Sequence, residues 1–133
     1  MNSLAALPGF FAHFLAGLAL LGGALILYAR STPHDEMALI RAGNLPAAVS
    51  LGGAVIGFAL PIGGAIAHSA SLLDAVVWAA VALLAQLAAF AASARFLLPG
   101  WRAATEKGEL GASALMAAIA VAVGLLNAAC LTP

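Results

Sequence analysis

Four long apolar stretches separated by short polar segments dominate the chain. Each holds about twenty residues, the length that an α-helix needs to cross a hydrocarbon core of roughly 30 Å. Alanine, leucine and glycine predominate and period-two alternation is absent, which favours helices over barrel strands. The stretches are Pro8–Ala29, Leu45–Ala67, Leu72–Ala94 and Leu110–Leu131. The pattern predicts an all-α polytopic membrane protein, with one transmembrane domain over residues 1–133.

Composition supports a membrane protein and excludes several other classes. Apolar residues make up 65% of the 133 residues and charged residues only 8%, whereas soluble domains carry about 25% charged residues. Five basic and five acidic residues balance, which argues against nucleic-acid binding, and one cysteine excludes a disulfide scaffold. The sequence contains no nucleophilic triad, phosphate-binding loop or metal-binding cysteine pair. We therefore expect no enzyme activity, no cofactor and no resident metal.

The basic residues predict how the chain crosses the membrane. Arg30 and Arg41 lie between the first two spans, and Arg95, Arg102 and Lys107 lie at or between the last two. Under the positive-inside rule both connections are cytoplasmic, and both termini and the 67–71 turn are periplasmic. Three aromatic residues would then mark the membrane interfaces, Tyr28 and Trp101 on the inner side and Trp78 on the outer side.

The two halves follow a similar plan, repeat one over about residues 8–68 and repeat two over about 72–131. After the first span, Thr32 is a suitable N-cap for a short interfacial helix over Pro33–Ala42, with acidic Asp35 and Glu36 in its first turn. In the second half a segment opens at Pro99 and closes at Gly108. Because both halves cross in the same direction, we interpret this as a parallel tandem repeat of two hairpins. The alternative is that proline and glycine simply bracket any membrane loop.

Small residues form a stripe along two of the spans. In lipid such faces bring helix backbones close together, so they favour packing within the chain or a homo-oligomer. The stripe of the second span comprises Ser50, Gly53, Gly57, Pro61, Gly64 and His68. We expect the opposite side, with Leu51, Val55, Phe58 and Ile62, to meet lipid. The stripe of the fourth span comprises Ser113, Ala117, Ala120, Gly124 and Asn127.

Polar side chains at membrane depth are the candidate functional residues, because they are costly there. The candidates for a polar pathway or packing site are His13, His68, Ser71, Asp74, Gln86, Asn127 and Cys130. Ser71 and Asp74 match a capping box, with a cation site as the alternative. Gln86 could instead form an interhelical hydrogen bond. Cys130 is either a subunit cross-link or a small apolar filler.

The two histidines could bind a metal or haem, since imidazole ligates both. His13 and His68 belong to no spacing motif, however, and hydrogen bonds to the backbone are the more common role of interfacial histidines.

Several strings together resemble the YjfL-like family of bacterial inner-membrane proteins, domain of unknown function 350. They are Thr32–Glu36, Leu39-Ile40, Gly43-Asn44, SLGGAVIGFALPIGGAI at 50–66, SASLLDAVVW at 69–78, Gln86-Leu87 and GLLNAACLT at 124–132. The resemblance implies four inner-membrane spans built from a repeated two-span unit. It gives weight to Gly43, Asn44, Gly53, Gly57, Pro61, Ser71, Asp74, Trp78, Gln86, Gly124, Asn127 and Cys130. Relatives often have glycine where this chain has Ala79. Their gene clusters with phage-shock-type proteins and polyamine or peptide-ligase enzymes imply a link to envelope maintenance.

Two functional hypotheses follow. The first is an oligomeric channel or small-solute or ion transporter, motivated by the polar group at the outer side; four short spans cannot enclose a solvated path, so any pore needs more than one chain. The second is a non-catalytic membrane anchor or sensor that docks a cytoplasmic membrane-stress protein. Asp35, Glu36 and Arg102, in the charged connections, are the partner-docking candidates.

Overall fold

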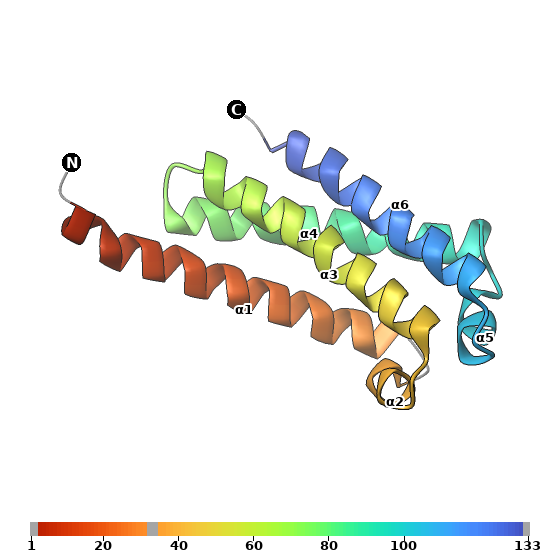
Figure 1. Cartoon of the computed structure of the whole chain (residues 1–133). Coiled ribbons are helices and arrows are strands. Elements are labelled where there is room, and N and C mark those ends of the chain that lie inside the picture. Colours follow the sequence, from red (N-terminus) through yellow and green to blue (C-terminus); the bar gives the residue numbers. More distant parts are fainter. Residues whose placement is uncertain (1–2, 32–34, 132–133) are drawn as a thin grey trace.

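The computed structural model describes residues 3–31 and 35–131, and this part of the chain is all-helical (Figure 1). A 3-10 turn, η1, at Ser3–Ala6 leads into the first long helix. The α-helices are α1 (Leu7–Ser31), α2 (Glu36–Arg41), α3 (Leu45–His68), α4 (Leu72–Phe96), α5 (Trp101–Glu106) and α6 (Leu110–Ala129). Four of them, α1, α3, α4 and α6, are long and apolar enough to cross a membrane. The predicted all-α fold with four spans is confirmed.

The loops lie at two opposite ends of the helix bundle. The start of α1, the α3–α4 turn and the end of α6 lie together at what we call the terminal end (Figure 1). The short helices α2 and α5 lie at the other end, the connection end. Both basic connections therefore share one end, as the sequence predicts. Which end faces the cytoplasm stays a prediction.

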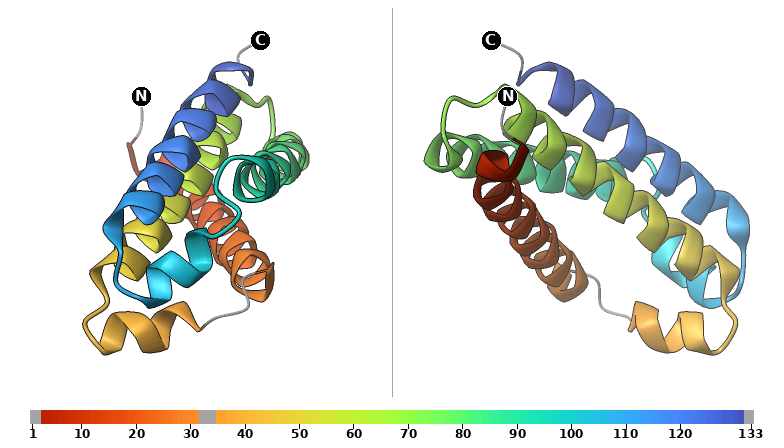
Figure 2. Two further views of the ribbon diagram at one scale, coloured as in Figure 1. Left: turned by 90° about the vertical axis from the view of Figure 1, so that its right-hand side faces the viewer. Right: turned by 60° about the vertical axis from the view of Figure 1, so that its left-hand side comes forward.

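Helix α3 is the central helix, with α1 and α6 on opposite sides of it (Figure 2). Half of its most apolar stretch is buried, against 6% for that of α1. The expectation that the side of α3 with Phe58 and Ile62 meets lipid is wrong, because these side chains are only 2% and 4% exposed. They form a core with Tyr28 of α1 and Leu83 of α4. Leu51 and Val55 are half-buried.

The glycine stripe of α3 packs against α6. A Cβ atom on Gly57 would lie 2.6 Å from the Ala120 carbonyl oxygen, and one on Gly53 would overlap Ala117. The approach at Gly64 is less tight, because a Cβ atom there would lie 3.3 Å from Ala128. Ser50 and Pro61, also in the stripe, are buried. Real Cβ atoms are not found as close to backbone as 2.6 Å. Helices α3 and α6 can therefore cross this closely only because Gly53 and Gly57 have no side chain.

The two connections share a short helix followed by a glycine. Gly43 has φ of +91° and Gly108 of +84°, the left-handed conformation that ends helices without strain only at glycine. Helix α2 begins at Glu36 with Asp35 as its N-cap, so Asp35 precedes the first turn instead of lying in it. The expected start at Thr32 and Pro33 lies outside the described residues. The tandem repeat itself stays a prediction.

Candidate functional site

A cavity of about 250 Å³ at the terminal end brings together several candidate residues. His68 ends α3, Asp74 lies in the first turn of α4, and Cys130 follows α6. All three line this cavity, with Trp78 and Ser69 beside them. Because each comes from a different helix, the α3–α4 turn and the end of α6 together build a small polar pocket at one end of the bundle. Cys130 is exposed there as a free thiol.

Ser71 and Asp74 cap the start of α4. The Ser71 Oγ accepts a hydrogen bond from the Asp74 backbone N–H over 3.1 Å. The Asp74 carboxylate accepts one over 3.1 Å from the N–H of Ala70, one residue earlier than the reciprocal bond of a capping box. One carboxylate oxygen is thus engaged by the backbone, and the side chain still faces the cavity.

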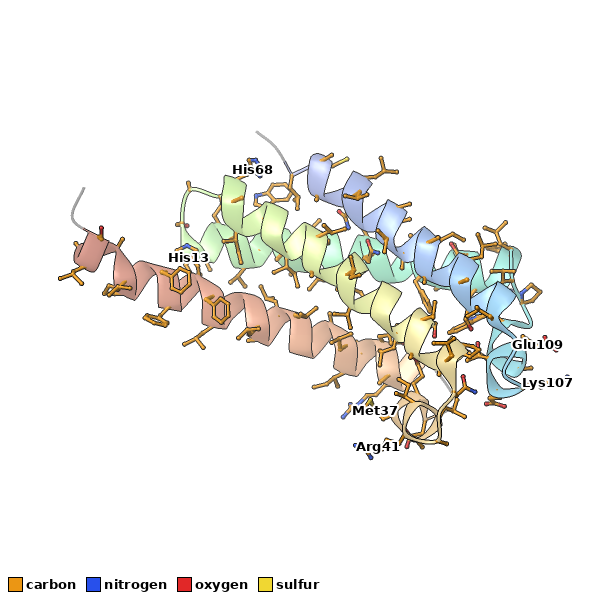
Figure 3. All side chains as sticks on the ribbon, in the orientation of Figure 1. His13, Met37, Arg41, His68, Lys107 and Glu109 are labelled. Atoms are coloured by element: carbon orange, nitrogen blue, oxygen red, sulfur yellow. The ribbon has the colours of Figure 1, made fainter. Side chains whose placement is uncertain are left out.

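Each of the two histidine side chains forms a hydrogen bond with the backbone of its own helix. The Nδ1 atom of His13 lies 2.7 Å from the Gly9 carbonyl oxygen, and that of His68 lies 3.0 Å from that of Gly64. Carbonyl oxygens only accept, so each Nδ1 carries a proton, and in the neutral ring Nε2 is then an acceptor. His68 lines the terminal-end cavity, whereas His13 is not among its lining residues. Figure 3 shows the two on separate helices. Among the described residues no group of three or more His, Cys, Asp or Glu side chains could hold a metal ion.

Two amides bridge α4 and α6 below this cavity. The Asn127 Nδ2 group donates to the Ala82 carbonyl oxygen over 2.7 Å. One step deeper, the Gln86 Nε2 group donates to the Ala120 carbonyl oxygen over 2.8 Å. We call Asp74, Asn127 and Gln86 the polar seam. It leads from the terminal end toward the middle of the bundle: Asn127 and Gln86 join α4 to α6, and Asp74 lines the cavity that Cys130, at the end of α6, also lines.

Gln86 is the most unusual member of the seam. Its side chain is only 3% exposed. Its Oε1 atom is buried and meets no hydrogen-bond donor in the described part of the chain. Buried polar atoms are almost always paired, because leaving one unpaired costs about 1–3 kcal/mol. This acceptor therefore marks a place in the seam where a donor or a cation would be stabilised.

At the connection end Asn44, a predicted cap of the second span, joins Thr105 and Ser113 in a polar cluster whose other contacts the sequence did not predict. The Asn44 Oδ1 atom caps α3, accepting from the Ala47 N–H over 2.8 Å. Its Nδ2 group also donates to the Thr105 carbonyl oxygen over 2.9 Å, which ties the two connections together. The Thr105 hydroxyl in turn lies 2.6 Å from that of Ser113. The small-residue stripe of α6 marks Ser113 in the sequence. No sequence pattern predicts the bond between Asn44 and Thr105, which are 61 positions apart.

The three docking candidates differ in how far they are available to a partner. Asp35 is exposed and caps α2, accepting from the Ala38 N–H over 3.2 Å. Glu36 is buried, with 7% of its surface exposed. Arg102 is half-buried and donates to the Ser31 carbonyl oxygen over 2.9 Å. Of the three, Asp35 therefore presents its charge most openly at the connection end.

The two aromatic residues expected at the inner interface are buried between helices at the connection end. Tyr28 is 1% exposed and Trp101 2%. Both pack edge to face on Phe90 of α4, with ring centroids 5.0 and 5.7 Å apart. Both lie at the connection end, so their place at the inner interface stays a prediction, but their rings pack into the bundle and do not face lipid. Trp78 is half exposed.

Comparison with known proteins identifies the family. The inner membrane protein YjfL of Escherichia coli strain K12 is 33% identical over 132 residues, covering 99% of both chains. The YjfL protein of Escherichia coli O157:H7 matches to the same extent. No solved structure matches the chain. The family model described as Domain of Unknown Function (DUF350) matches residues 1–131. The chain therefore belongs to the family of domain of unknown function 350.

Proposed function

We propose that this protein is an inner-membrane transporter or channel for a small solute or ion, which passes along the polar seam. The name of the Escherichia coli relative supports the inner-membrane location, and the four long apolar helices fit it. In the expected orientation the terminal-end cavity opens to the periplasm. Asp74 and the Nε2 atom of His68 would then receive a cationic or hydrogen-bonding solute, such as an amine.

The observation that carries this proposal is the buried Gln86 Oε1 atom, which has no hydrogen-bond donor among the described residues. If the amide served only to hold α4 and α6 together, the bond from its Nε2 group to Ala120 would be sufficient. A solute donor or a cation at this depth would satisfy the oxygen and offset the cost of burying it.

The pathway requires more than one chain. Within one chain α3 and α6 approach backbone to backbone, so no route passes between them. The seam is more open toward the terminal end, where Asp74 and Asn127 are only half-buried. We expect a neighbouring copy to complete the wall of the seam, in keeping with the predicted homo-oligomer.

Flux from proteoliposomes tests this function. Purified protein would be reconstituted, and the efflux of monovalent ions and of polyamines followed for the wild type, Asp74→Asn and Gln86→Leu. Ser93→Ala is the matched control, because this hydroxyl is also on α4 but donates to the carbonyl oxygen of Ala89 on its own helix. We expect the two seam variants to lose most of the flux and the control to retain it. Flux equal to that of empty vesicles, or unchanged in both seam variants, would contradict the proposal.

A second candidate function is a membrane anchor or sensor that docks a cytoplasmic membrane-stress protein. The supporting observation is that exposed charges lie at the connection end, on Arg41, Lys107 and Glu109 (Figure 3) and on Asp35, the N-cap of α2. Pull-down from membranes with wild type and with Asp35→Ala/Arg41→Ala would test it. A partner that both proteins capture equally, or no partner at all, would count against docking at this surface.

A further inference from the structure

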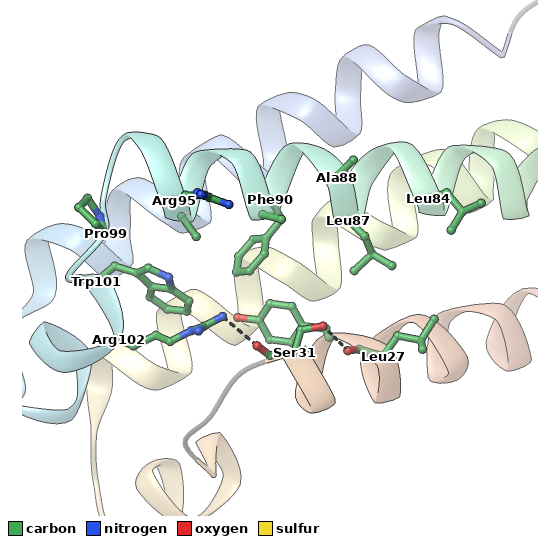
Figure 4. A pocket seen from close by; sticks show the side chains of 13 residues that line it. Leu27, Ser31, Leu84, Leu87, Ala88, Phe90, Arg95, Pro99, Trp101 and Arg102 are labelled. Carbon is green, nitrogen blue, oxygen red and sulfur yellow. Dashed lines mark hydrogen bonds between the residues drawn. The ribbon is translucent and has the colours of Figure 1, made fainter.

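A second, larger cavity lies at the connection end, between α1, α4 and α5 (Figure 4). Its volume is about 780 Å³, within the range of roughly 300–1,000 Å³ typical of small-molecule sites. Its two ends differ in chemistry. Leu27, Leu84 and Leu87 line one end, and Arg95 and Arg102 face it from the other.

The apolar end continues along the bundle. A further cavity of about 720 Å³ lies between α1 and α4 and shares Leu27, Leu84 and Leu87 with the first. Small residues such as Ala16, Gly23 and Ala80 line it, which leaves room along the helices. We call the two together the α1–α4 groove. This groove is long and largely apolar, lies on the surface of the bundle, and ends at Arg95 and Arg102.

The arginine end carries a positive charge. Arg95 is exposed, and Arg102 is held in place by its bond to the Ser31 carbonyl oxygen at the end of α1. That bond uses only one of the five N–H groups of a guanidinium. Among the described residues that line this cavity there is no carboxylate. The charges of Glu36 and Arg102 both lie close enough to the Tyr28 hydroxyl to affect it. The Glu36 carboxylate therefore offsets part of the positive charge of Arg102. The two arginines and this carboxylate leave a net positive charge, which matches a single anionic phosphodiester.

We propose that the α1–α4 groove binds an anionic glycerophospholipid of the phosphatidylglycerol type. Arg95 and Arg102 would hold the phosphate, because guanidinium groups pair with phosphate through two parallel N–H bonds and basic pockets between helices bind anionic headgroups. An acyl chain would lie in the apolar part of the groove. The ligand must combine an anionic group at the depth of helix ends with a long apolar tail, and a membrane lipid meets both conditions.

Lipid binding by native mass spectrometry tests the proposal. Protein in a neutral detergent would be titrated with phosphatidylglycerol and, separately, with phosphatidylcholine of the same acyl chains. We expect phosphatidylglycerol to bind more tightly, and each of Arg95→Gln and Arg102→Gln to weaken it by about fivefold, as expected for one basic contact with an anionic lipid. Arg41→Gln is the matched control, since Arg41 is exposed at the same end but does not line the groove. It should bind like the wild type.

A variant that leaves both arginines in place keeps the test sharp, because Arg102 also supports the end of α1. Leu84→Trp fills the apolar part of the groove from an exposed position and should weaken lipid binding without unfolding the protein. Equal binding of the two lipids, or equal losses in the Arg41 variant, would overturn the proposal. So would saturation of the site by inorganic phosphate alone, or cross-linking of Leu27→Cys/Cys130→Ser chains to each other in phosphatidylglycerol vesicles, which would place a second copy there instead.

Discussion

Gly124 of α6 lies against Gly57 of α3, so that a Cβ atom on Gly124 would be 2.6 Å from the Gly57 carbonyl oxygen. This contact fixes how closely the two helices cross. Ala120, one turn away on α6, is also the acceptor for Gln86, so the crossing positions the seam as well. The close crossing of α3 and α6 therefore lies at the centre of the bundle and also positions Ala120, the residue that Gln86 contacts in the proposed pathway.

We predict that Gly124→Ala and Gly57→Ala each destabilise the fold by about 1–3 kcal/mol, because an added methyl group overpacks the crossing. Gly63→Ala is the control, since no described residue of another helix lies within 4 Å of a Cβ there. It should be neutral or slightly stabilising. Thermal unfolding midpoints in one detergent measure all three. Equal midpoints for Gly124→Ala and Gly63→Ala would show that the two helices cross less closely than their backbone contact implies.

We predict that Asn127→Leu lowers the free energy of unfolding by about 1 kcal/mol, the usual contribution of an interhelical hydrogen bond in a membrane. The lost contact is the bond to the Ala82 carbonyl oxygen. Gln86→Leu should cost less, because it also removes the buried oxygen that has no donor in the described part of the chain. Unfolding in mixed micelles measures both. A larger loss for Gln86→Leu than for Asn127→Leu would mean that the Gln86 oxygen is paired.

We predict that Asn44→Ala destabilises more than Asn44→Ser. Both variants lose the bond to Thr105, but serine can still cap α3, whereas alanine also loses the cap, worth about 1 kcal/mol. Hydrogen exchange at the start of α3 and the unfolding midpoint report the two effects. If serine and alanine are equally harmful, the bond to Thr105 and not the cap carries the role of this residue.

The Gly43 backbone leads to a fourth prediction. Gly43→Ala should cost about 1–2 kcal/mol, because a side chain is strained at its positive φ. Gly100→Ala is the control, since Gly100 has φ of −103° and open space around it. Unfolding midpoints of the two variants give the comparison. Equal midpoints would indicate that the turn after α2 rearranges at little cost.

The sequence predicts the helices of this fold well, but it predicts less well which side chains are buried between them. Span length and composition place the four long helices within a few residues, and glycine spacing identifies the face of α3 that meets α6. The same pattern assigns Phe58 and Ile62 to lipid, because a buried and a lipid-facing apolar side chain look alike in a membrane protein. Only the position of α1 and α4 on the other side of α3 shows that both are core residues.

The candidate site follows the same rule. Ser71 and Asp74 are neighbours in sequence, so their caps can be predicted from spacing. Depth in the membrane groups His68, Asp74 and Cys130 with His13, and the terminal-end cavity contains the first three but not His13. The burial of Glu36 and Trp101 depends on how α2 and α5 fold back, and no local pattern records that.

The number of subunits in lipid discs, determined by native mass measurement, is the decisive test of the proposed pathway. The pathway lies along a seam that one chain leaves incomplete, so we predict an assembly of three or more copies in the membrane. A monomer or a simple dimer would leave too few helices to complete the pathway and would contradict the proposal.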